Sequence, residues 1–158
     1  MGKYAFITNT GSNTISVVDL QLNKEVKQIA IGDSPRGAMA IDRSRGFGFV
    51  SNCAGNTISV VNLKTGFEEK KIEVGLAPRG VDISPDNNTI LITAFQRMML
   101  TDIDLAYDRV SVVSLDNLTR VGDVPSGLGA CSLNIIDSEE IEEFFVNNPY
   151  YMNMIAMA

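Results

Sequence analysis

Two arginines in the sequence stand in almost identical surroundings, 43 residues apart. Arg36 lies in the tetrapeptide Pro-Arg-Gly-Ala and Arg79 in Pro-Arg-Gly-Val. A guanidinium group presents its N–H donors as a planar fork, which matches the paired oxygens of a carboxylate or a phosphate. If the fold brings these two positions together, they would grip a small anion.

A second group of charged residues lies in the segment 95–108, which reads FQRMMLTDIDLAYD. Asp102, Asp104 and Asp108 offer the hard oxygen ligands that Ca²⁺ prefers, although the segment lacks the glycine and the distal glutamate of an EF-hand loop. The competing interpretation is an apolar loop that packs on a neighbouring subunit or covers a channel. Arg97 in the same segment is a further candidate for ligand binding.

Asn9 and Asn52 end two similar β-rich runs, YAFITN and FGFVSN. Asparagine at the end of a strand usually caps the turn that follows, because its side chain hydrogen-bonds the local backbone. We expect a structural role first, and ligand binding is the alternative.

Residue types that carry most catalytic chemistry are missing or isolated. The sequence has no histidine, which removes the commonest general base and the commonest transition-metal ligand. Two cysteines, Cys53 and Cys131, make no disulfide framework, and we expect free thiols. A nucleophilic role for Cys53 would need a neighbouring base. We predict neither a catalytic set nor a cofactor.

Composition is that of a globular protein: 45% of the 158 residues are hydrophobic and 20% are charged. The net charge of −6 argues against nucleic acid or an anionic membrane as the main partner. No apolar run reaches the roughly 18 residues of a membrane span, and the start MGKYAFITN does not resemble a signal peptide. The expected location is the cytoplasm.

The spacing of the two arginines belongs to a longer internal repeat. The run YAFITNTGSNTISVVDL at Tyr4 aligns without a gap with FGFVSNCAGNTISVVNL at Phe47. A looser third copy begins with TILITA at Thr89 and carries about nine extra residues within 95–108. The sequence therefore predicts three units, at approximately 3–45, 46–88 and 89–136.

Each unit divides into short runs rich in β-branched and aromatic residues, separated by Gly, Asn, Asp and Pro. The first two units lack the 3.6-residue periodicity of a helical repeat. Four short strands in a unit of about 43 residues are typical of one blade of a β-propeller. We therefore predict an all-β fold.

Three motifs recur in the same order: FITN, NTISVVD and PRGA in the first unit, and FVSN, NTISVVN and PRGV in the second. They resemble the YVTN-type β-propeller repeat, strongly over 3–94 and weakly over 95–136. The resemblance implies about three four-stranded blades. In the strand order of that family the innermost strand follows the Pro-x-Gly motif, which implies that Arg36 and Arg79 lie at the mouth of the central channel, with Leu128 at the equivalent place in the third unit.

Propellers with these repeats include surface-layer proteins, lactonase-like enzymes and proteins that hold redox cofactors, largely through histidine. For this chain we expect a non-enzymatic scaffold that binds a small anion, a peptide or a protein partner on the channel-mouth face. The alternative is a lactonase-like hydrolase or isomerase that uses the acids of 95–108, with a divalent metal.

Three blades are too few to close a ring, since propellers typically have 4–8. The runs give three strands, then two complete units, then a last inner strand at 129–135. We therefore expect a homodimer in which each last inner strand completes the first blade of the other copy, in a six-bladed ring. The tail 137–158 predicts a short helix followed by an apolar end, and the competing interpretation aligns EFFVNN with YAFITN as a further strand.

Overall fold

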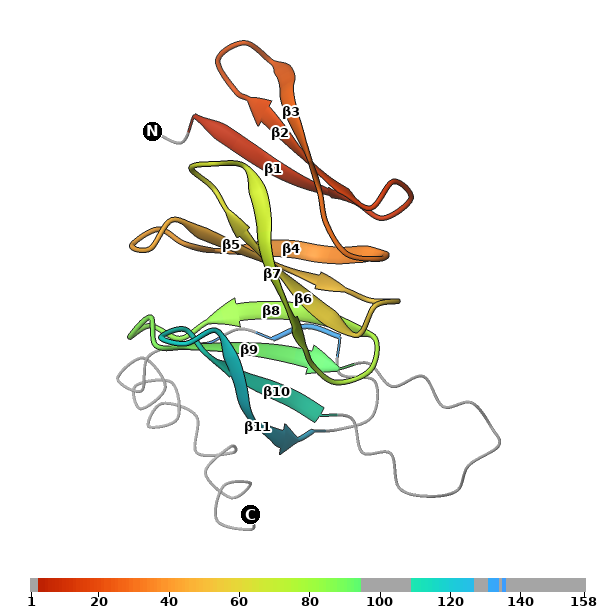
Figure 1. Ribbon diagram of the computed structural model, residues 1–158, viewed down its shortest axis with the longest axis vertical. Helices are drawn as coiled ribbons and strands as arrows, with labels where there is room; N and C mark the ends of the chain where they lie inside the picture. The colour runs from red at the N-terminus through yellow and green to blue at the C-terminus, as the bar shows by residue number, and fades with distance from the viewer. Residues whose placement is uncertain (1–2, 95–108, 127–130, 134, 136–158) are drawn as a thin grey trace, which may run out of the picture.

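The structure is a computed structural model that describes residues 3–94, 109–126, 131–133 and 135 (Figure 1). Within these ranges the chain is all-β, as predicted, and no helix capable of crossing a membrane occurs there. The predicted tail helix lies outside the described residues. The strands are β1 (Tyr4–Asn9), β2 (Thr14–Asp19), β3 (Lys24–Ala30), β4 (Pro35–Asp42), β5 (Phe47–Asn52), β6 (Thr57–Asn62), β7 (Phe67–Glu73), β8 (Pro78–Ile83), β9 (Thr89–Ala94), β10 (Arg109–Ser114) and β11 (Thr119–Pro125).

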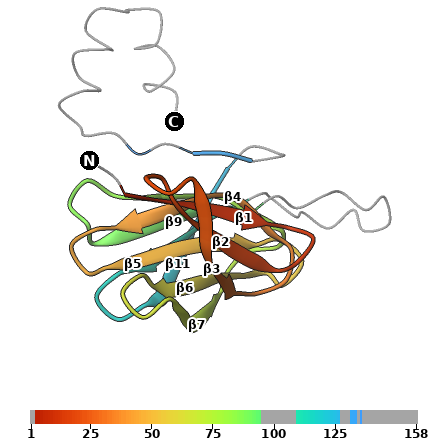
Figure 2. The same ribbon diagram turned by 90° about the horizontal axis from the view of Figure 1, so that it is seen from above.

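The strands form three antiparallel sheets with the orders β1-β2-β3, β4-β5-β6-β7 and β8-β9-β10-β11. Within each sheet, strands that follow one another in the chain are neighbours. Figure 1 shows the three sheets stacked face to face in chain order. Figure 2, turned by 90°, shows β4, β5, β6 and β7 following one another from one edge of the stack to the other.

A β-bulge recurs at the same place in all three sheets. It lies between Val17 and Val18, between Val60 and Val61, and between Val112 and Val113. The first two bulges are 43 residues apart and the last two are 52 apart, so nine residues have been added to the third unit. The segment 95–108 joins β9 to β10, which pair from Ala94 and Arg109 onward, as the repeat predicts.

Two apolar clusters fill the spaces between the sheets. One lies between the first and second sheets and contains Ile15, Val17, Ile29, Ile31, Val50 and Val61. The other lies between the second and third sheets and contains Phe49, Ile58, Val60, Ile72, Val74, Ile90, Ile92, Val113 and Leu115. Successive strand residues point to opposite faces, so the middle sheet is buried on both sides.

Asp42, fully buried at the end of β4, organises the turn that follows it. Its Oδ1 accepts hydrogen bonds from Ser44 N, Ser44 Oγ and Arg45 N at 2.6 to 3.0 Å, and its Oδ2 accepts one from Arg45 Nη1 at 3.1 Å. Arg45 also donates to Asn87 O and to Asp116 Oδ1. This arginine thereby ties a turn of the second sheet to two turns of the third.

Burial alone would raise the pKa of Asp42, but the hydrogen bonds from Ser44 and Arg45 outweigh it and hold the pKa below the usual 3.8. The carboxylate therefore adds to stability above pH 3.8, and this contribution is lost as the pH falls through the lowered folded pKa.

We expect Asp42→Asn to lower the free energy of unfolding by about 1–3 kcal/mol at pH 7, because it removes the charge that accepts these hydrogen bonds. The deficit should shrink as the pH falls below 3.8. Urea unfolding at pH 7 and at a pH below 3.8 measures the free energy of unfolding of both chains. Asp116→Asn is the matched control, since this acid is also bonded to Arg45 but its side chain is 74% exposed; an equal loss in the two variants would contradict the role given to Asp42.

Candidate functional site

Two kinds of connection meet on one side of the stack. The turns β1–β2 and β5–β6 lie on the same side as the connections β3–β4 and β7–β8 (Figure 1). Hydrogen bonds join them: Thr10 Oγ1 donates to Pro35 O at 2.7 Å, and Cys53 N donates to Ser34 O at 3.0 Å. β9 ends and β10 begins beside the start of β8, since Ala94 pairs with both Pro78 and Arg109.

Two asparagines in these turns set the entry of the strands that carry the arginines. Asn13 and Asn56 have left-handed φ angles of 57° and 54°. The Oδ1 atom of Asn13 accepts from Ser34 N at 2.8 Å, and that of Asn56 accepts from Ala77 N at 2.9 Å. Our interpretation of the sequence missed both residues, although the repeated Asn-Thr-Ile-Ser motif contains them.

A cavity of about 600 Å³ lies between the inner strands β4 and β8 and the residues 131–133. Arg36 and Arg79 both line it, so the structure brings together the two residues that the repeat singled out. Its full lining is Arg36, Gly37, Ala38, Met39, Ala40, Arg79, Gly80, Val81, Asp82, Cys131, Ser132 and Leu133.

The glycine of each Pro-Arg-Gly motif lets the next inner segment approach closely. A Cβ atom on Gly37, whose φ is +73°, would lie 2.8 Å from Arg79 O. A Cβ atom on Gly80 would lie 2.9 Å from the Cα of Ser132 and 3.2 Å from Cys131 O. Gly80 thus lies against Cys131 O as Gly37 lies against Arg79 O, so Cys131 occupies in the third unit the position of Arg79 in the second. We had expected Leu128 there, which lies outside the described residues.

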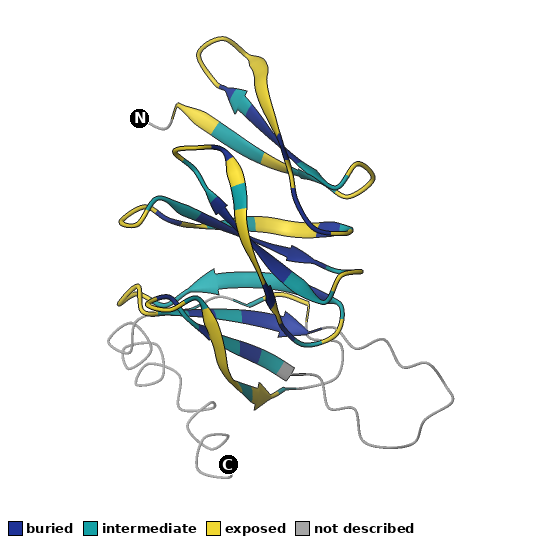
Figure 3. Ribbon diagram, viewed as in Figure 1, coloured by how far each residue is buried: buried dark blue, intermediate teal, exposed yellow. Residues whose placement is uncertain are grey.

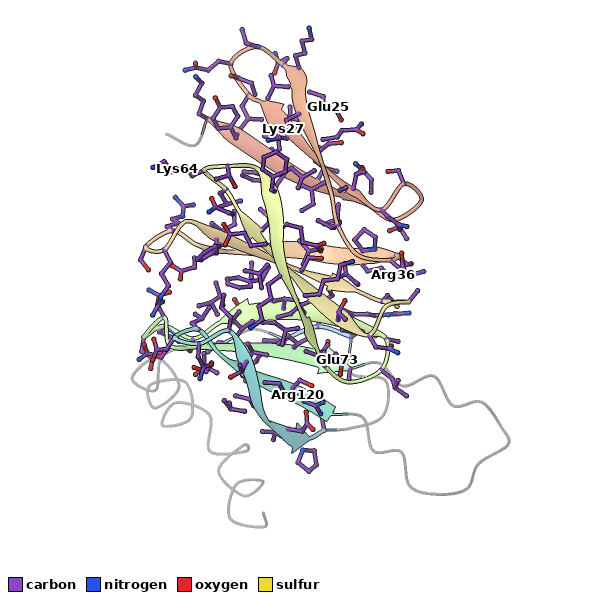
Figure 4. All side chains as sticks on the ribbon, in the orientation of Figure 1. Glu25, Lys27, Arg36, Lys64, Glu73 and Arg120 are labelled. Carbon is purple, nitrogen blue, oxygen red and sulfur yellow. The ribbon has the colours of Figure 1, made fainter. Side chains whose placement is uncertain are left out.

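The cavity presents positive charge. Arg36 is exposed, and its side chain makes no hydrogen bond or ion pair with another described residue; Figure 4 shows it at the beginning of β4, beside the turns. Arg79 is partly buried, and its Nη1 approaches Cys131 Sγ at 3.6 Å. The acid on the lining, Asp82, accepts from two backbone amides, Ile83 N at 2.9 Å and Ile135 N at 2.8 Å. Its carboxylate is thus engaged by the backbone.

Asn9 and Asn52 lie outside the cavity lining and bond within their own hairpins. Asn52 Nδ2 donates to Thr57 Oγ1 at 2.9 Å and to Ser59 Oγ at 2.8 Å, and Asn52 is fully buried. Asn9 Nδ2 makes the same bonds in the first sheet. In the third sheet the corresponding residue is Ala94, at the end of β9.

The remaining predicted ligands, Arg97, Asp102, Asp104 and Asp108, lie outside the described residues. Within the described part of the chain, no three acidic, cysteine or histidine side chains gather closely enough to hold a metal ion. Cys53 and Cys131 are both free thiols, and Cys131 is exposed.

No protein-family model matches the sequence, and no curated protein matches it. Solved structures do. Hydrazine synthase of Kuenenia stuttgartiensis superposes with a TM-score of 0.72 at 23% identity, over 83% of this chain and 35% of that chain. A functionally unknown protein from Desulfotomaculum acetoxidans gives 0.65 at 13% identity, over 79% and 37%. Dihydro-heme d1 dehydrogenase NirN in complex with DHE gives 0.62 at 17% identity, over 80% and 28%.

Hydrazine synthase and NirN are β-propeller proteins. The fold of this chain is propeller-like and partial. The chain spans about a third of the length of these structures, and the likeness at this identity concerns the fold alone.

We expect Asn52→Ala to destabilise the chain by about 1–3 kcal/mol, because the buried hydroxyl group of Ser59 and the partly buried one of Thr57 lose a donor. Anion affinity, measured by calorimetry, should stay unchanged, since Asn52 does not reach the cavity. Asn9→Ala removes the same bonds from a less buried hairpin and should cost less. A fall in affinity without a fall in stability would place Asn52 in the ligand site instead.

Proposed function

We propose that this chain is a β-propeller scaffold without catalytic activity of its own, and that its channel-mouth face binds a small molecule bearing a carboxylate or a phosphate. The observation that carries the proposal is the convergence of Arg36 and Arg79 on one cavity. Each arginine comes from the same motif in successive units, so the binding groups arise from the repeat itself.

The chemistry of the lining favours an anion over a cation or an apolar ligand. Two guanidinium groups offer charge-assisted hydrogen bonds, worth roughly 1.5–3 kcal/mol each when shielded from water. Among the described lining residues the one carboxylate is that of Asp82, and it accepts hydrogen bonds from two backbone amides. A volume of about 600 Å³ suits a small ligand, within the usual 300–1,000 Å³ of ligand pockets.

We further propose that the three sheets are blades of the YVTN type and that two copies close a six-bladed ring. Two features support this. The outer faces of the first and third sheets expose apolar residues, among them Ile7 and Val124. The residues 131–133 and 135 lie beside β8 in the place of a further inner strand, where Gly80 contacts Ser132.

Phosphate and citrate serve as probes of the arginine site, with thermal shift and calorimetry as the measurements. We expect both anions to raise the melting temperature of the full chain, because they bind the folded state only. Arg36→Gln and Arg79→Gln should each weaken binding by about 10- to 100-fold. The affinity of Arg79→Lys should lie between that of the unchanged chain and that of Arg79→Gln.

Arg43→Gln is the matched control, since Arg43 is exposed in the β4–β5 turn on the opposite side of the stack. Its affinity for phosphate and citrate should equal that of the unchanged chain. No anion-dependent shift in the unchanged chain, or an equal loss in the Arg43 variant, would overturn the anion site.

Light scattering on the full chain tests ring closure separately. We expect twice the mass of one chain, because the exposed apolar faces of the outer sheets are buried only when the ring closes. A stable monomer would contradict closure by a second copy without touching the anion site. A trimer would point to nine blades.

A further inference from the structure

Every sheet in the stack has two faces, which we name by chain direction. The N-face of a sheet looks toward the sheet before it in the chain, and the C-face toward the sheet after it. In the middle sheet, Val50 and Val61 on the N-face pack against the first sheet. Phe49 and Val60 on the C-face pack against the third. Each junction inside the chain is thus a C-face against an N-face.

No described residue covers the N-face of the first sheet. Ile7 holds the place that Val50 holds in the second sheet and Ile92 in the third, as their strand pairings show. Val50 and Ile92 are 0% exposed, whereas Ile7 is 49% exposed. Leu20, whose counterpart Leu115 in the third sheet is buried, is exposed as well. The repeat has thus kept apolar residues at positions that remain exposed among the described residues.

Among the described residues, the C-face of the third sheet is exposed in the same way. Val124 holds the place of Ile29 and Ile72 in the first two sheets. Those two residues are 3% and 5% exposed, whereas Val124 is 53% exposed. Val112, the counterpart of the fully buried Val60, is only partly buried. Figure 3 shows that buried positions concentrate in the middle of the stack.

The two open faces are complementary by the pattern of the chain itself. Ile29 and Val50 share the cluster at the first junction, and Ile72 and Ile92 share the cluster at the second. The next pair in this series is Val124 with Ile7. These two residues lie in the outermost sheets of the stack, so one chain does not bring them together (Figure 1).

A polar contact repeats across the same junctions. Gly32 N donates to Ser59 Oγ at 3.3 Å at the first junction, and Gly75 N donates to Ser111 Oγ at 3.0 Å at the second. Ser16 is the counterpart of these serines, and it lies on the open N-face of the first sheet. A backbone donor placed there would set the register of a third junction.

The edge of the first sheet is also incomplete. The second and third sheets each begin with an inner strand, β4 or β8, whereas among the described residues β1 is the inner edge of its sheet. The residues 131–133 and 135 run beside β8, where Ile135 N donates to Asp82 Oδ2 at 2.8 Å. They follow β8 as β8 follows β4, but no described strand pairs with them.

From these observations we infer that a second copy of this chain docks head-to-tail. The C-face of its third sheet lies on the N-face of the first copy's first sheet, and its residues 131–133 and 135 lie along the first copy's β1. In a closed dimer this junction forms twice, so that Val124 of each copy meets Ile7 of the other. The inference rests on the ring closure proposed above. It adds which two faces meet, in which direction along the chain they face, and which residue pair lies in the contact.

A charge-pair experiment tests whether the face that carries Ile7 in one copy meets the face that carries Val124 in the other. Ile7→Lys and Val124→Glu should each make the chain monomeric, with a dimer dissociation constant raised at least about 100-fold, because each junction then holds one charge without a partner. Mixing the two variants should restore a dimer. One junction of that dimer pairs Lys with Glu and the other is unchanged. Sedimentation velocity measures the mass.

Three controls make each outcome decisive. Ile7→Glu mixed with Val124→Glu should stay monomeric, since one junction then opposes two like charges. Leu22→Lys, at an exposed leucine in the β2–β3 turn, should remain a dimer. Circular dichroism of the monomeric variants should show a folded chain, because both positions are about half exposed.

The outcomes separate this inference from the proposal on which it rests. An unchanged chain that is monomeric at all concentrations overturns ring closure and the inference together. A dimer that survives both single substitutions overturns the head-to-tail contact but leaves dimerisation in place. Failure of the mixed variants to dimerise overturns the pairing of position 7 with position 124. Anion binding by Arg36 and Arg79 is measured independently of all three.

Discussion

The middle sheet has no polar face, and the rest of the structure depends on this constraint. In β5, Phe49 and Val50 are adjacent, point to opposite sides and are both fully buried. Strand geometry sends neighbouring side chains to opposite faces, so a strand of this kind needs cover on both sides. The sheets therefore stack, and the position of every inner strand follows from the stacking. By the same rule, the exposed apolar residues on the outer sheets indicate faces that need cover from another surface.

The cavity is a consequence of that stacking. A single Pro-Arg-Gly motif places one arginine at the beginning of an inner strand, and stacking places two such beginnings against one another. Gly37 permits the close approach to Arg79 O that a side chain would prevent. Asn13 and Asn56 hold the entries to both strands from the neighbouring turns. A repeated structural motif thus becomes a cluster of like charges.

The third unit departs from the other two at the positions that matter for the site. Ala94 ends its second strand where Asn52 ends the corresponding one, and Cys131 stands where the arginine would be. Positive charge in the cavity is therefore concentrated on Arg36 and Arg79, beside a thiol that Arg79 approaches at 3.6 Å.

The sequence by itself determined the strands, their antiparallel order and the place of the insertion, because alternation, turn residues and a fixed repeat act over a few neighbouring residues. It also singled out Arg36 and Arg79. Only the tertiary structure decided that Cys131 replaces the arginine and that Arg45 ties two sheets together. These are contacts between units, and they depend on which faces meet. Burial over the whole stack decides that choice, and no local pattern records it.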